Sequence, residues 1–182
     1  SADEWLGPNG EFPLEPFHDK LSAPNGSDGI LLKLNSEGAY RWHGFYGAPS
    51  SGSSESINDV VIDDEDGIYV TGRTAGSWLT VSGTAPLHDG LLDDVFAMKL
   101  TPSGQHIWHT FWGNPAPQAG MDIALDGAKD IFIALTSVGS WSGQNDTPPI
   151  HPANSEYLQG VLSLSTTGQY RWHTFYDSAQ SQ

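Results

Sequence analysis

The chain has 182 residues, no cysteine and a formal net charge of -15, from 22 Asp and Glu against 7 Lys and Arg. We expect one domain over residues 1–182, because this length suits a single core better than two. The missing cysteines exclude disulfides and thiolate metal sites, and the negative charge opposes nucleic acid and anionic membranes. No apolar run approaches the ~20 residues of a membrane-spanning helix, so we expect no membrane insertion.

The first predicted element is a β-hairpin around the turn 35–38. The apolar run 30–34 leads into this turn, and the aromatic segment 40–46 follows it. Gly38 can supply the positive φ angle of such a turn. Trp5 and a Pro-rich loop that holds His18 come earlier. This first unit, approximately residues 1–50, is partial because it lacks a hairpin that the later units have.

The second unit, residues 57–114, contains two predicted hairpins. Strands 59–63 and 68–72 form the first, and strands 95–100 and 106–112 form the second. Between them lie Trp78 and a Pro-rich loop with His88. Short β-branched and aromatic runs bounded by Gly, Asp and Ser are typical of strands.

The third unit, residues 120–177, repeats this order. It predicts strands at 122–126, 131–135, 161–164 and 170–176, with Trp141 and His151 between the two hairpins. Three tryptophans of the last strands, Trp42, Trp108 and Trp172, are spaced 66 and 64 residues apart. Self-similarity at a nearly constant period indicates a repeat architecture. The sequence therefore predicts an all-β, antiparallel fold of about two and a half four-stranded units.

The best repeat positions resemble the SBBP repeat of secreted and surface proteins of bacteria and archaea. They are Ile-Tyr-Val-Thr-Gly at 68–72, Asp-Val-Phe-Ala-Met-Lys-Leu at 94–100, and residues 108–111. The third unit departs from the pattern, with Ala134-Leu135 in place of Thr-Gly and Ser163 in place of Lys. The resemblance implies blades like those of a β-propeller and no shared enzymatic activity. Closed propellers have about four to eight blades, so one chain of this length does not close a ring.

The acidic turn at residues 63–67 is a candidate calcium site, with Asp63, Asp64 and Asp66 as possible oxygen ligands. The alternative is a β-turn with a solvated acidic face. Calcium is the one cofactor that the sequence suggests, and no other metal site is expected.

The repeated histidines and tryptophans have a structural and a functional interpretation. We expect His43, His109 and His173 to face away from the tryptophan before each of them, and His106 to face away from His109, which opposes a shared zinc site. Trp5, Trp78 and Trp141 are expected to fill the core or the space between units. The alternative is that they stack on sugar rings.

The sequence contains no nucleophile elbow, phosphate loop or zinc-protease motif, so we expect no enzyme and assign no catalytic residue. The open strand edges predict a structural subunit that assembles with copies of itself into a filament, tube or sheath. Burial of Trp5 or of the tail 178–182 against another chain would support this. The alternatives are a carbohydrate-binding or adhesive module and a fragment of a larger secreted propeller enzyme.

The expected location is extracellular or at the cell surface. The sequence starts at Ser1 without Met, which we interpret as a mature end left by signal cleavage. Two sequons, at Asn25 and Asn145, lie in turn-like surroundings and are candidates for glycosylation.

Overall fold

The computed structural model describes residues 5–18, 27–49, 54–90 and 93–177, and over these residues the protein is all-β. Ten strands form three antiparallel sheets of two, four and four strands, and none of these sheets closes into a barrel. A 3-10 turn, η1 (Gln144–Asp146), lies between β8 and β9. The predicted antiparallel all-β architecture is confirmed.

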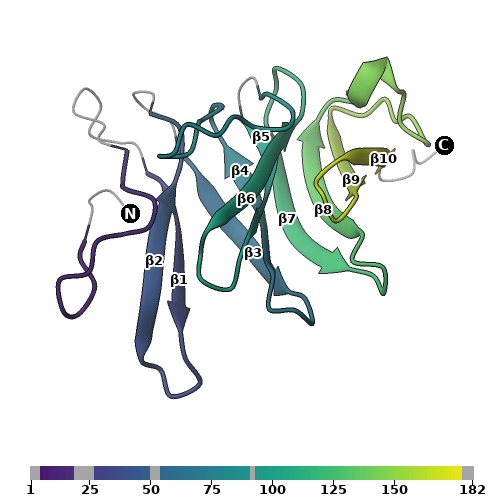
Figure 1. Ribbon diagram of the computed structural model, residues 1–182. Helices are drawn as coiled ribbons and strands as arrows, with labels where there is room; N and C mark the ends of the chain where they lie inside the picture. The colour runs from purple at the N-terminus through teal and green to yellow at the C-terminus, as the bar shows by residue number, and fades with distance from the viewer. Residues whose placement is uncertain (1–4, 19–26, 50–53, 91–92, 178–182) are drawn as a thin grey trace.

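Each sheet corresponds to one repeat unit. Unit 1 consists of β1 (Gly29–Leu34) and β2 (Tyr40–Tyr46). Unit 2 has the strand order β3-β4-β5-β6, and unit 3 the equivalent order β7-β8-β9-β10. Their bounds are β3 (Ser56–Ile62), β4 (Ile68–Thr74), β5 (Asp94–Leu100), β6 (His106–Trp112), β7 (Gln118–Leu125), β8 (Ile131–Val138), β9 (Tyr157–Leu164) and β10 (Tyr170–Tyr176). The three sheets lie side by side, with unit 2 between the other two (Figure 1).

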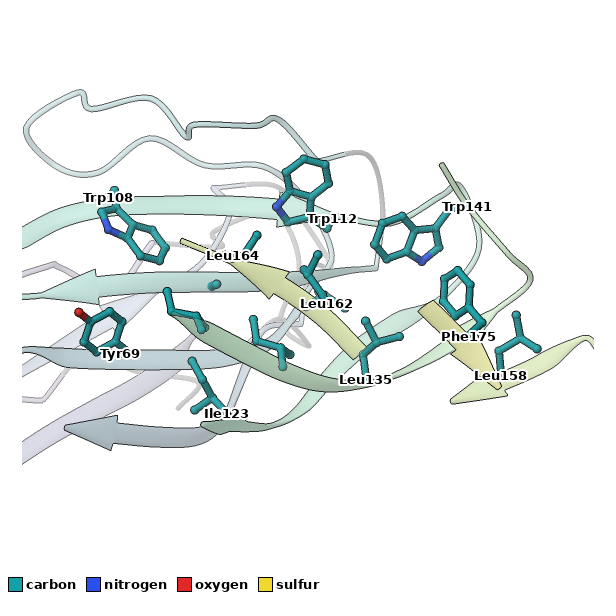
Figure 2. Close-up of a cluster of buried hydrophobic side chains, with 14 residues drawn as sticks. Tyr69, Trp108, Trp112, Ile123, Leu135, Trp141, Leu158, Leu162, Leu164 and Phe175 are labelled. Carbon is teal, nitrogen blue, oxygen red and sulfur yellow. The ribbon is translucent and has the colours of Figure 1, made fainter. Parts of the chain in front are cut away.

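The core lies between the sheets, because unit 2 buries both of its faces. Along β4 and β5 almost every residue is buried, and alternate side chains point to opposite neighbours. Val70 and Met98 belong to the cluster shared with unit 1, whereas Tyr69 and Ala97 belong to the cluster shared with unit 3. Figure 2 shows the second cluster, in which aromatic rings of unit 2 face leucine and isoleucine side chains of unit 3.

The last hairpin of each unit has the turn glycine that the sequence predicts. Gly38, Gly104 and Gly168 have φ angles of 78°, 82° and 78°. This left-handed conformation costs glycine little, since it has no β-carbon. The strand after each turn then carries a β-bulge, because one residue between its first residue and its tryptophan has no partner in the ladder.

A short extended segment covers the outer edge of each unit, and we call these three segments the outer straps. They are residues 14–15, 87–88 and 150–151, and each forms two backbone hydrogen bonds of 2.8–3.2 Å with β2, β6 or β10. Glu15 of unit 1 holds the strap position that His88 and His151 hold in units 2 and 3, whereas His18 lies outside the strap. The peptide N–H and the ring of His18 lie instead 2.9 and 3.4 Å from the Asp28 carboxylate.

Candidate interaction surfaces

Each unit contains a histidine whose two ring nitrogens both have a hydrogen-bond partner, which determines which nitrogen carries the proton. In unit 1, His43 Nε2 lies 2.9 Å from the Trp5 carbonyl oxygen, and His43 Nδ1 lies 2.7 Å from the Tyr40 hydroxyl. Because a carbonyl only accepts, Nε2 carries the proton and Nδ1 accepts from the tyrosine. Unit 3 repeats this arrangement with His173, Trp141 and Tyr170. Both ring nitrogens are therefore occupied, and these histidines are structural.

Unit 2 has His106 where the other units have tyrosine. Its Nε2 lies 2.9 Å from His109 Nδ1, so the prediction that His106 and His109 face opposite ways is wrong. The bulge at Ile107 adds one residue to the strand and brings both rings to the same face. Burial, together with the neighbouring His109, lowers the pKa of His106 to about 4. Burial also lowers the pKa of His109.

The three tryptophans proposed for sugar stacking lie against protein side chains. Trp78 and Trp141 are buried. Each stacks on the histidine of its own unit and meets the edge of a phenylalanine, Phe111 or Phe175. Trp5 is partly exposed and stacks on His43 at 3.9 Å within the same chain. These contacts agree with the core interpretation and leave Trp78 and Trp141 no exposed face for a sugar ring.

The acidic turn holds a lysine of the next unit among its carboxylates. Asp63 accepts hydrogen bonds from the backbone N–H groups of Glu65 and Gly67, at 2.9 and 2.7 Å. Lys129 Nζ, from the equivalent turn of unit 3, lies 2.7 Å from Asp64 and 3.0 Å from Glu65. These ion pairs place an ammonium group where a calcium ion would be needed. Asp66 has a φ angle of 63° in the turn. Among the described residues, no group of three or more His, Asp or Glu is arranged to hold a metal.

One pair of carboxyl groups comes together between units 2 and 3. Burial alone would raise the pKa of Asp59, but hydrogen bonds from the Ile123 N–H and from Asp122 lower it. The shared hydrogen bond and the negative charge of Asp59 raise the pKa of Asp122. The Ile123 N–H lies 2.9 Å from Asp59 Oδ2, so this pair ties the first strands of the two units together.

Of the two sequons, Asn145 lies exposed in η1 with a φ angle of 56°, and Asn25 lies outside the described residues. The tail 178–182 also lies outside them.

Unit 1 presents an apolar surface to solvent, which we call the leading face: Ile30, Leu32 and Leu34. These side chains are 37%, 45% and 47% exposed. The equivalent side chains of unit 2, Phe96, Met98 and Leu100, are at most 1% exposed, because unit 1 covers them. The same sequence positions are therefore core in one unit and surface in another.

Unit 1 has one hairpin among the described residues, and this leaves two further features exposed beside the leading face. β1 pairs with β2 alone, so its other edge has no strand partner among the described residues. On β3, Val60 and Ile62 are 46% and 56% exposed. Their equivalents on β7 are Ile123, which is 5% exposed, and Leu125, which is partly buried, since β7 packs on β3 and β4. A hairpin beside β1 would cover Val60 and Ile62 in the same way.

Unit 3 presents a second apolar surface, which we call the trailing face: Phe132, Val161, Trp172 and Tyr176. The equivalent residues of unit 2, Tyr69, Ala97, Trp108 and Trp112, are buried against unit 3. Tyr176, in contrast, is 56% exposed, and the other three are partly exposed. The strands were predicted from the sequence, but these two faces were not, although the partial first unit was a signal for the leading face.

No protein-family model matches the chain, and a search of curated proteins finds no match. The resemblance to the SBBP repeat therefore stays a prediction. The fold itself defines the class: an all-β protein of repeated antiparallel sheets, with an apolar surface at each end of the row. Within the described residues, no helix has the length and hydrophobicity to span a membrane.

Proposed function

We propose that the chain is a non-enzymatic structural subunit that assembles end to end with copies of itself. The observation that carries this proposal is the exposure of Leu32 and its neighbours at positions where the other units are buried. Contiguous exposed apolar surface on a soluble protein marks an interaction site. In this assembly the trailing face of one copy covers the leading face of the next, at the surface of the cell or outside it.

The positions and the chemistry of the two faces determine the kind of assembly. Units 1 and 3 lie on opposite sides of unit 2 (Figure 1), and the leading face is aliphatic whereas the trailing face is largely aromatic. A contact between two different surfaces of identical subunits produces a ring or an open helical filament. The open edge of β1 adds a backbone template beside the joint, as in other cases of strand complementation.

A mixing experiment tests this proposal. Leu32→Asp blocks the leading face, and Tyr176→Asp blocks the trailing face. Val81→Asp is the matched control, because Val81 is 66% exposed in the loop between β4 and β5 of unit 2 and belongs to neither face. We expect light scattering to show that the particle mass of the parent chain and of the control rises with concentration. Each blocked variant should remain a monomer. An equal mixture of the two blocked variants should stop at dimers, because one intact face remains on each copy.

Two results would overturn the proposal. The first is a parent chain that stays monomeric at every concentration. The second is a Val81→Asp control that abolishes growth as fully as the end-face variants do, which would indicate non-specific association. Circular dichroism of each variant confirms that it is folded before its assembly is measured.

A second candidate function, glycan binding, is favoured by one cavity between units 2 and 3. Its volume is 490 Å³, within the range of small-molecule sites, and Tyr157 and Arg73 line it. The Tyr157 ring is 73% exposed and free to stack on a sugar. Arg73 is held by Asp93, with N–O distances of 2.9 and 2.5 Å. A glycan array on the parent and on Tyr157→Ala tests this candidate, and an array without hits would end it.

A further inference from the structure

The outer parts of neighbouring units meet through a contact that occurs twice in the chain. Trp42 of unit 1 and Trp108 of unit 2 each direct the indole N–H to a carbonyl oxygen in the turn of the following unit, at 3.3 Å in both cases. The acceptors are Pro102 and Thr166, the second residues of the turns 101–104 and 165–168. Because the same contact forms in both places although the two turns differ in sequence, it is a feature of the repeat.

The outer straps take part in the same contact. Leu14 packs over Gly104 together with Trp42, and Leu87 packs over Gly168 together with Trp108. At both glycines a β-carbon would overlap the leucine and the tryptophan. A leucine from the strap and an indole from the last strand of one unit thus cover the turn glycine of the next unit.

The turn of unit 1 lacks this contact, and so do the strap residue and the tryptophan of unit 3. Among the described residues no unit precedes unit 1, and the space beside Gly38 in its turn 35–38 is open. At the other end of the row, Ile150 holds the strap position of Leu14 and Leu87 and is 57% exposed, and Trp172 is partly exposed. Unit 2 separates these two ends, so Trp172 does not reach the turn of its own chain (Figure 1).

We infer that Ile150 and Trp172 of one copy bind the turn 35–38 of the next copy. Ile150 packs over Gly38, and the Trp172 indole N–H donates to the carbonyl oxygen of Ser36, as the two internal contacts do. Trp112 packs on Tyr170 with ring centroids 5.0 Å apart, and by the same equivalence Tyr176 meets Tyr40. The inference rests on the proposed end-to-end assembly and gives it a register.

The absence of cysteine allows a direct test by cross-linking. The variant Ile150→Cys/Glu37→Cys places thiols on both sides of the joint, and a short bismaleimide joins thiols that lie close together. Glu37 is chosen because it neighbours Gly38 without a positive φ angle. The internal control is Leu87→Cys/Thr167→Cys, which has the same two positions within one chain. The mismatched control is Ile150→Cys/Ser82→Cys, in which Ser82 is an exposed loop residue.

We expect the end variant to give a ladder of linked dimers and longer chains, the internal control to give linked monomers, and the mismatched pair to give neither. Ile150→Asp should raise the concentration of half-maximal assembly about tenfold, which corresponds to ~1.4 kcal/mol. Assembly of the end variant without a ladder, while the internal control is linked, would overturn the register and leave the proposed function standing. No assembly by light scattering for the parent chain would overturn both.

Discussion

The exposure of Leu32 leads to a prediction that uses the repeat as its own control. Leu32, Met98 and Leu162 occupy equivalent positions on the strand that precedes the glycine turn of each unit, β1, β5 or β9. Met98 and Leu162 are fully buried, whereas Leu32 is 45% exposed. Truncation to alanine at a buried site removes transfer free energy and leaves a cavity, which costs about 2–5 kcal/mol.

For Leu32→Ala the expected loss in free energy of unfolding is under about 1 kcal/mol. About half of the side chain already contacts water, and the site can relax without a cavity. Urea unfolding of all three variants, followed by tryptophan fluorescence at a concentration where the chain is monomeric, gives the comparison. The slopes should agree, so that the midpoints report stability.

An equal loss for Leu32→Ala and Met98→Ala in the monomer would refute the reasoning, because it would show that something in the same chain already covers the leading face. At higher concentration the result should change. If a second copy covers Leu32, its truncation weakens assembly as well, and the concentration of half-maximal light scattering rises.

Three further predictions concern Trp108, the histidine pair of unit 2 and the lysine in the acidic turn. Trp108→Ala should cost about 3–5 kcal/mol in urea unfolding, because Trp108 fills the space between units 2 and 3, and a loss below about 1 kcal/mol would place it at the surface. The lowered pKa values of His106 and His109 mean that the unfolded chain, in which histidine titrates near 6.5, binds more protons than the folded chain. Stability should therefore fall as the pH drops from about 6.5 to about 4, and the fall should be smaller in His106→Tyr; identical pH profiles of the two proteins would contradict this. Lys129→Ala removes the ammonium group from the acidic turn, so calcium should raise the melting temperature of this variant more than that of the parent. Equal shifts would show that the lysine does not compete for the site.

The positions of the strands could be predicted from the sequence because the signal is local. Each apolar run alternates or is flanked by turn residues, and the repeat supplies each assignment two or three times. The glycines at 38, 104 and 168 adopt the predicted positive φ angles for a steric reason that needs no tertiary context.

What the sequence did not reveal depends on how strands pair. The bulge at Ile107 is a property of the ladder between β5 and β6, so counting residues along one strand placed His106 on the wrong face. The straps have no strand signal in the sequence, because each pairs over only two residues and directly follows a proline. The leading and trailing faces are exposed because each lies on the outer side of an end unit among the described residues. This is visible only when buried and exposed members of one repeat position are compared.

The outer straps also restrict the direction in which a polymer of this chain can grow. A sheet protein whose last strands were bare could join its neighbours sideways, edge to edge, as it lengthened. Here the edges of β2, β6 and β10 are each occupied at two backbone positions, directly after Pro13, Pro86 and Pro149. Polymers of this chain should therefore stay thin and unbranched, and loss of a strap should appear in micrographs as lateral bundling before it appears as unfolding.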